Sequence, residues 1–377
     1  MGEIMNSNQK KFGIYVFLST FSRNLIEVFI PIILYKYGYS IKEVLFYYFF
    51  ANFMSLLLSY PFVYLSQKYN NKILSIIGIL AFSILQVLLN FMMHSIYYLI
   101  FIATLYAIYR RGYWISRRYY NLKVIKNNNI STTYSIISII NQIGVIVSAY
   151  LGSIVLDYIN LNVLTILAIF LFIASIIPLY LLKFEHKRVD NKLEISNTLK
   201  QIPKKDIYLF GSYELMNVVK FLIPLYLFIY VKNTYQTIGI VNLVTNLSLM
   251  IFTYMFGKTL DISKKNFLSM SIILTVFVFV LKINLMGYAL LMISFLEGIV
   301  TKMYELSISK EFYTLSKNFE YNNYNLIYEL IQNSFRSIIT LIFVVFNFEL
   351  KTMIYITLIF IIIGIFFNIK TIDTTNK

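Results

Sequence analysis

Residues 27–31 read EVFIP and residues 220–224 read KFLIP, and each stretch lies inside a long apolar run. In both, a charged residue stands one helical turn before a proline. A second pair of stretches keeps almost the same separation, with VYLSQKYNNK at residues 63–72 and GKTLDISKKN at residues 257–266. A repeat over such a distance indicates a chain built from two related halves.

The composition around these stretches is that of a membrane protein. Hydrophobic residues make up 59% of the 377 residues and charged residues 13%, whereas about a quarter of the residues in a soluble domain are charged. Apolar runs of about 20 residues, the length that crosses a hydrocarbon core of roughly 30 Å as a helix, recur along the whole chain. The sequence therefore predicts an all-α integral membrane protein.

Twelve transmembrane helices are predicted, in two pseudo-symmetric six-helix bundles. The fourth, fifth, tenth and eleventh are polar enough for a hydropathy window to overlook one of them. The helices are expected at residues 12–35, 41–65, 72–94, 96–119, 130–157, 161–183, 206–231, 236–257, 266–284, 285–309, 323–348 and 351–370.

The domain organisation follows from the long polar stretch at residues 184–205, which is predicted to be a cytoplasmic linker loop. It separates an N-terminal bundle, residues 1–183, from a C-terminal bundle, residues 206–377. The first apolar run carries Arg23 and Glu27 and has no small-residue cleavage site behind a short apolar core. We expect this run to stay in the membrane and not to act as a cleaved signal.

The net charge of the chain is +16, and the distribution of its lysines and arginines between the two sides of the membrane predicts the topology. With the amino terminus in the cytoplasm, most lysines and arginines fall on the cytoplasmic side, Arg117 and Arg118 among them. The opposite side receives Lys36, Lys42, Lys232, Lys282 and Lys351. The positive-inside rule then predicts a multi-pass plasma-membrane protein with both termini cytoplasmic, and no nucleic acid is needed as a partner to explain the charge.

Several classes of chemistry have no support in the residues. The chain has no cysteine, and its two histidines, His94 and His186, are expected in or near loops. It contains no phosphate-binding G-x-x-x-x-G-K-[ST] loop, and no nucleophile and base stand out as a pair. We therefore expect neither an enzyme nor a bound metal or cofactor.

The turn after the second helix of each half carries a family signature, G-x-x-x-D-R-x-G-R-R. The second half matches it with Gly257, Asp261 and Lys265, and the first half retains only Gln67, Lys68 and Lys72, without the acidic residue. With twelve spans, a basic central loop and cytoplasmic termini, the chain resembles the major facilitator superfamily of secondary transporters, as a divergent bacterial member. The resemblance implies a gating role for this turn, a monomer in the lipid bilayer, and alternating access.

Two further stretches bear on this resemblance. Arg110 and Arg111 are followed by Gly112 in the fourth helix, in a compressed form of a family pattern in which an arginine precedes a glycine. In the fifth helix, small residues stand at every fourth position and allow two backbones to approach closely. Helix packing is the favoured interpretation of that spacing, and a glycine-rich antiporter signature is the alternative. The small residues are Gly144, Ser148 and Gly152.

Charged residues inside the apolar runs are the candidate functional residues. A charge at the bilayer centre costs at least about 2.5–3.5 kcal/mol, so such residues usually face a cavity or a partner. Arg23 and Glu27 share a helix face and can pair locally, but the repeat also places Glu27 level with Lys220, which suggests a contact between the halves. The alternative role of the whole set is structural ion pairing. The predicted substrate or proton pathway comprises Arg23, Glu27, Arg110, Arg111, Glu214, Lys220, Glu297, Glu329 and Arg336, with Lys302 and Glu305 as further charges in the tenth helix.

These observations predict a secondary active transporter that moves a small polar solute, zwitterionic, anionic or peptide-like, across the plasma membrane. Protons are the expected coupling ion, because a buried carboxylate such as Glu27, Glu214 or Glu297 is suited to binding and releasing a proton. Export is slightly favoured, and proton-coupled uptake is the first alternative. The second alternative is a non-transporting sensor or assembly partner, which the incomplete first-half turn keeps open.

Overall fold

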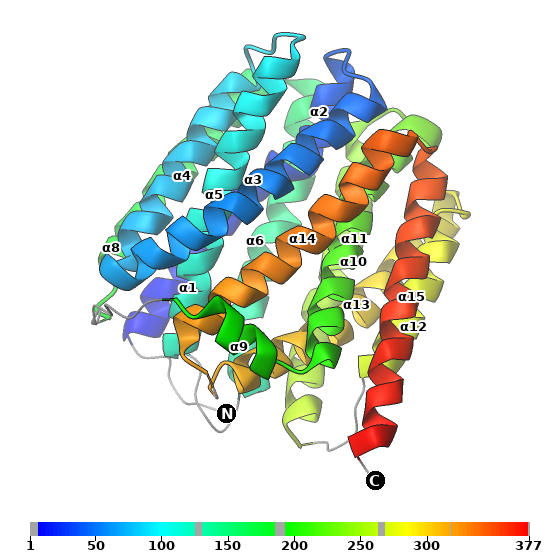
Figure 1. Cartoon of the computed structure of the whole chain (residues 1–377). Coiled ribbons are helices and arrows are strands. Elements are labelled where there is room, and N and C mark those ends of the chain that lie inside the picture. Colours follow the sequence, from blue (N-terminus) through cyan, green and yellow to red (C-terminus); the bar gives the residue numbers. More distant parts are fainter. Residues whose placement is uncertain (1–6, 125–129, 185–192, 263–267, 318, 376–377) are drawn as a thin grey trace.

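The structure is a computed structural model of the chain, and it describes residues 7–124, 130–184, 193–262, 268–317 and 319–375. The described residues are almost entirely helical (Figure 1). The first half contains α1 (Ser7–Asn24), η1 (Glu27–Phe29), α2 (Ile30–Lys36), α3 (Ile41–Lys68), α4 (Asn71–Leu88), α5 (Ile96–Val124), α6 (Ile130–Tyr158), α7 (Leu161–Ala174) and α8 (Ile176–Tyr180). The remainder contains α9 (Ile195–Gln201), α10 (Lys204–Tyr230), α11 (Tyr235–Ile262), α12 (Leu268–Lys282), α13 (Gly287–Leu315), α14 (Tyr321–Phe346) and α15 (Leu350–Thr375).

A helical segment stands at each of the twelve predicted spans. The first span is made of α1, η1 and α2 together, and the sixth of α7 and α8. Among the described residues, eight segments are long and apolar enough to cross a membrane, and α12 and the Leu350–Ile363 part of α15 are apolar but shorter. The fourth and tenth predicted spans, α5 and α13, do not meet this criterion, and both belong to the four that were expected to be polar.

The break in the first span coincides with the repeated sequence. Pro31 is the second residue of α2, and η1 begins at Glu27. A proline has no backbone N–H, so it cannot donate to the carbonyl one turn earlier. In the second half, α10 continues through Pro224 without interruption. The two prolines therefore occupy equivalent positions in the sequence but have different effects on the backbone.

The ends of the molecule are defined by the chain direction. α1 begins and α15 ends at one end, here called the terminal end, and the turn at residues 37–40 lies at the opposite end, here called the distal end (Figure 1). At the distal end, Ser40 and Glu43 form a capping box that starts α3: Glu43 N donates to Ser40 Oγ at 3.3 Å and Ser40 N donates to Glu43 Oε2 at 2.8 Å. At the terminal end, α9 packs beside the start of α14, where Glu194 N donates to Asn323 Oδ1 at 3.0 Å.

Helices from the two halves of the sequence pack directly on one another. α3 lies against α14 and α6 lies against α11, and Figure 1 shows α3 and α14 running side by side. Within the first half, α5 packs on α3 and α4, and α1 packs on α6 and α7. Within the second half, α10 packs on α14 and α15, and α13 packs on α11 and α12. α1, α5, α10 and α13 each pack on one of the four helices α3, α6, α11 and α14, and their side chains line the site described below.

Small residues occupy the positions where helix backbones approach most closely. A Cβ atom on Gly144 would lie 3.2 Å from the carbonyl oxygen of Phe17 on α1, and one on Gly152 would lie 2.5 Å from that of Leu25, directly after α1. Ser148 donates to the Val145 carbonyl of its own helix at 3.2 Å. Gly112 of α5 likewise faces the α4 backbone, where a Cβ would meet Gly78 N at 3.0 Å. These glycines allow α1, α4, α5 and α6 to pack without a gap.

Candidate functional site

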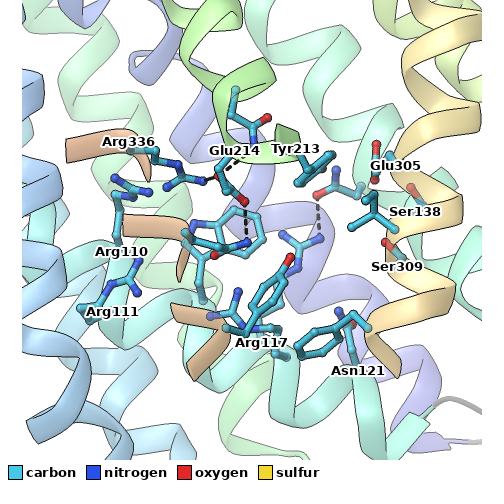
Figure 2. Close-up of a pocket in the computed structure, with 18 of the residues that line it drawn as sticks. Arg110, Arg111, Arg117, Asn121, Ser138, Tyr213, Glu214, Glu305, Ser309 and Arg336 are labelled. Atoms are coloured by element: carbon cyan, nitrogen blue, oxygen red, sulfur yellow. Dashed lines mark hydrogen bonds and ion pairs between the residues drawn. The ribbon is translucent and has the colours of Figure 1, made fainter. Parts of the chain in front are cut away.

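A cavity of about 380 Å³ lies among α1, α3, α5, α6, α10, α13 and α14 (Figure 2). Both halves of the sequence contribute to its lining, which is rich in arginine and tyrosine. The acidic residues of the lining are Glu27, Glu214 and Glu305. Its arginines are Arg23, Arg110, Arg111, Arg117, Arg118 and Arg336. Six guanidinium groups therefore face three carboxylates around one cavity.

The first ion pair of the lining is local. Arg23 Nε lies 2.9 Å from Glu27 Oε2, one helical turn further along the chain. Tyr106 of α5 also donates its hydroxyl to Glu27 Oε1 at 2.7 Å. The ion pair between Glu27 and Lys220 that the repeat suggested is not present among the described residues, because Arg23 on the same segment supplies the nearer cation. Lys220 is half-buried and does not belong to the cavity lining.

The second cluster joins the two halves. Glu329 of α14 has no exposed surface and forms ion pairs with both Arg111 and Arg118 of α5. Arg118 Nε also donates to Asn325 Oδ1 of α14 at 3.0 Å. One buried carboxylate thus holds two guanidinium groups from the opposite half. Because α14 starts and α5 ends at the terminal end, this cluster lies on the terminal side of the cavity.

The third cluster lies within the second half. Glu214 of α10 is buried, and its carboxylate forms an ion pair with Arg336 of α14. Glu214 also accepts hydrogen bonds from Gln332 Nε2 at 2.5 Å and from Asn217 Nδ2 at 3.1 Å. Figure 2 shows Glu214 and Arg336 directed into the same cavity as Arg110.

Arg110 and Arg117 differ from the other lining arginines, because no carboxylate pairs with either of them among the described residues. Arg117 is well supplied with neutral partners: it donates to Tyr113 Oη and to Asn141 Oδ1, each at 2.8 Å. For Arg110 the recorded hydrogen bond is to Asn52 Oδ1 at 2.5 Å. The exposed fractions of the two residues are 8% and 6%, so both positive charges are buried.

Like Lys220, the predicted pathway residue Glu297 does not line the cavity. Glu297 of α13 pairs with Lys282 of α12 and accepts a hydrogen bond from Thr245 Oγ1 at 3.3 Å. It belongs to the packing of α11, α12 and α13 and not to the lining. Lys302, one of the further charges of the tenth span, is fully buried, where its Nζ lies 2.5 Å from Ser138 Oγ and 3.1 Å from the lining residue Glu305.

The predicted pathway omitted Arg117 and Arg118, which were counted among the positive charges of the cytoplasmic side although the span predicted at residues 96–119 contains them. α5 continues to Val124, so both arginines lie inside the helix and reach the cavity. The signal was present in the spacing: Arg117 and Arg118 follow Arg110 and Arg111 by two helical turns, which brings the two pairs to the same face.

The gating turn is only partly described. Gln67 is buried, Lys68 Nζ lies 4.5 Å from the Tyr64 ring, and Lys72 Nζ donates to the carbonyls of Tyr180 and Leu182, each at 2.7 Å. Lys72 thereby ties the start of α4 to the end of the sixth span. Of the second-half turn, Gly257 is buried in α11. Lys265 and the side chain of Asp261 lie outside the described residues.

Comparison with known proteins agrees with this architecture. A sequence model described as the Major Facilitator Superfamily matches residues 12–312. A solved structure described as "Crystal structure of a bacterial homologue of iron transporter ferroportin in outward-facing state" aligns with a TM-score of 0.69 at 11% identity, over 99% of this chain and 100% of that one. No curated protein matches the sequence. The family match extends over most of the chain, which therefore belongs to the major facilitator superfamily.

Proposed function

We propose that this protein is a proton-coupled secondary active transporter that exports a small polar, zwitterionic or peptide-like solute across the plasma membrane. The observation that carries the proposal is the buried, charged cavity of about 380 Å³ to which both halves contribute. A cavity of this size suits a small solute, and charges buried within a membrane protein usually mark a transport pathway.

The mechanism we propose is alternating access between residues 1–183 and residues 206–377. Contacts that join the halves are found on both sides of the cavity. On the terminal side, Arg111 and Arg118 share Glu329. On the distal side, Tyr48 stacks on Phe221 with ring centroids 4.2 Å apart. Opening the cavity to one side requires the contacts of that side to separate while the others hold, which is the basis of a rocking motion.

The distal side has a second inter-half contact that supports the same proposal. Asp157, at the end of α6, accepts hydrogen bonds from the backbone amides of Tyr235 at 3.2 Å and Gln236 at 2.7 Å. These amides belong to the first turn of α11, where unpaired N–H groups favour a negative charge. The contact is polar and lies at the surface, so it can form and break at low cost.

For the coupled proton, Glu27 and Glu214 are the suitable carriers among the three acidic residues first considered, because both line the cavity. We favour Glu214. Protonation of its carboxylate would remove the negative charge that pairs with Arg336. The cavity would then become more positive in the same step of the transport cycle. Glu297 is less suitable, because it is engaged with Lys282 outside the lining.

Iron, which the description of the similar structure mentions, is not supported as the substrate of this protein. The described residues contain no group of three or more His, Cys, Asp or Glu side chains that could hold a metal ion. The cavity lining carries twice as many arginines as glutamates, so a divalent cation would meet net repulsion.

The experiment that tests the function is untargeted mass spectrometry of cells and medium, comparing deletion, wild-type and overexpressing strains. An exporter predicts a solute that accumulates inside the deletion strain and appears in the medium on overexpression. A solute left in the medium of the deletion strain would instead show uptake. A Glu214→Gln protein expressed at the wild-type level serves as the transport-impaired control. No difference across strains and growth conditions would contradict transport and favour a sensor or assembly role.

A further inference from the structure

The positive charge of the cavity is permanent. Arginine stays protonated at any physiological pH, so a buried arginine cannot neutralise itself by losing its proton. Even when Glu329 is counted with the lining, six guanidinium groups face four carboxylates. Burying charge without a counter-charge is costly. A negatively charged solute would supply the missing counter-charge.

Arg110 is the group best placed to meet that solute. A guanidinium carries five N–H donors in a fixed fork. The partners recorded for Arg110 are Asn52, through one hydrogen bond, and the Tyr106 ring, 5.8 Å from the guanidinium carbon. The guanidinium lies in the cavity lining, and Figure 2 shows it directed toward the region near Glu214 and Arg336. Arg110 therefore retains donors that a bound group can use.

Arg117 provides the contrast within the same helix. It lines the same cavity but already donates to Tyr113, to Asn141 and, at 3.5 Å, to Thr20. Its guanidinium carbon also lies 5.1 Å from the Trp114 ring. Arg117 therefore adds to the positive potential while its hydrogen-bonding capacity is largely used within the protein.

Building on the proposed transport function, we propose that the transported solute is an organic anion and that Arg110 binds its carboxylate or phosphate group. A planar guanidinium fork matches either group through two parallel hydrogen bonds. The tyrosines and Trp114 around the arginines suit the organic part of such a solute. This inference narrows the polar substrate class to its negatively charged members.

Trp114 offers a direct test, because it is the sole tryptophan of the chain and lines the cavity. In this test, tryptophan fluorescence is excited selectively over that of tyrosine, and its quenching is measured with three quenchers: iodide, which is negative; caesium, which is positive; and acrylamide, which is neutral. The measurement uses the full-length protein in phosphatidylcholine nanodiscs at fixed ionic strength. After normalisation to acrylamide, we expect iodide to quench on the order of 10-fold more effectively than caesium, because a positive cavity concentrates anions.

Variants assign the effect to Arg110. Arg110→Gln is expected to reduce the iodide-to-caesium ratio severalfold, whereas Arg110→Lys retains the charge and should retain the ratio. Lys232→Gln is the matched control, since it removes the same charge from an exposed position outside the cavity. Equal or stronger quenching by caesium would overturn the proposal, as would an unchanged ratio in a folded Arg110→Gln protein.

The identity of the transported solute separates this inference from the proposed function. If the comparison of strains reveals an exported anion and Arg110→Lys weakens its transport at unchanged expression, both proposals hold. A neutral or cationic solute would leave transport standing and overturn the anion site. If no solute moves in any strain, the transport proposal fails, while the quenching ratio still decides whether the cavity is an anion site.

Discussion

Glu329 on α14 is fully buried and pairs with Arg111 on α5, so a single carboxylate ties the second half of the chain to the first. Arg118 shares the same carboxylate. In the alternating-access mechanism proposed here, this cluster must separate whenever the terminal side of the cavity opens. Its strength would then help to set how much of the protein is closed on that side.

Removing the shared carboxylate should destabilise this closed state. Glu329→Gln leaves two buried guanidinium groups without their counter-charge, a change that typically costs roughly 3–5 kcal/mol. We expect a lower melting temperature of the purified protein and faster labelling of cysteines placed on the cavity wall. Both are measured in detergent, with the wild type alongside.

A triple variant separates charge from packing. Arg111→Met, Arg118→Met and Glu329→Leu together replace the cluster with apolar side chains of similar length, and such replacements are often neutral or stabilising. We expect the melting temperature to return toward that of the wild type while transport is lost. A triple variant that transports normally would show that the ion pairs of Glu329 are not needed to close the terminal side of the cavity during transport.

These clusters show what the sequence could and could not predict. The apolar runs defined nearly every helix, since membrane-spanning length is a strong constraint. The place of Arg117 and Arg118 in the cavity lining was not predicted, because both were counted only as positive charges of the cytoplasmic side, near the end of the span predicted at residues 96–119, and α5 runs on to Val124. Their spacing of two helical turns from Arg110 and Arg111 predicts that the two pairs lie on the same helix face.

The choice of ion-pair partner was harder to predict. The four-residue spacing made Arg23 a local partner for Glu27, whereas the repeat suggested Lys220 in the other half. The structure pairs Glu27 with Arg23. Glu329 was predicted to belong to the substrate or proton pathway, but its two arginine partners come from α5, far away in sequence, and that contact depends on how the halves pack.

Proton coupling should depend on Glu214. Glu214→Gln keeps the size of the side chain but cannot bind and release a proton, so we expect solute-dependent proton movement to be abolished while exchange of solute for solute continues. The measurement follows internal pH with a trapped dye in proteoliposomes. Glu43→Gln, at the exposed capping box of α3, is the control and should cost only about 1 kcal/mol of stability. Retained coupling in Glu214→Gln with loss in Glu27→Gln would transfer the role to Glu27.

The proposed topology can be mapped without background, because the chain has no cysteine of its own. Met93 is 65% exposed beyond α4 at the distal end, and Tyr69 is 53% exposed between α3 and α4 at the terminal end. If both termini are cytoplasmic, a membrane-impermeant maleimide should label Met93→Cys in intact cells. It should label Tyr69→Cys only after permeabilisation. The reverse pattern would invert the proposed orientation.

The close approach of α1 and α6 makes a prediction about Gly152. A Cβ there would lie 2.5 Å from the Leu25 carbonyl oxygen, and backbone cannot move aside as a flexible side chain can. Gly152→Ala should therefore destabilise the protein by about 1–3 kcal/mol, the usual cost of overpacking. Ser148→Ala, one turn earlier, is the matched control: Ser148 is also buried, and among the described residues its hydroxyl bonds to the carbonyl of Val145 in its own helix, so we expect a loss of no more than about 1 kcal/mol. Thermal unfolding of both variants in the same detergent tests this. If Gly152→Ala were as stable as Ser148→Ala and transport were nevertheless lost, the small residues of α6 would serve the transport cycle and not only helix packing.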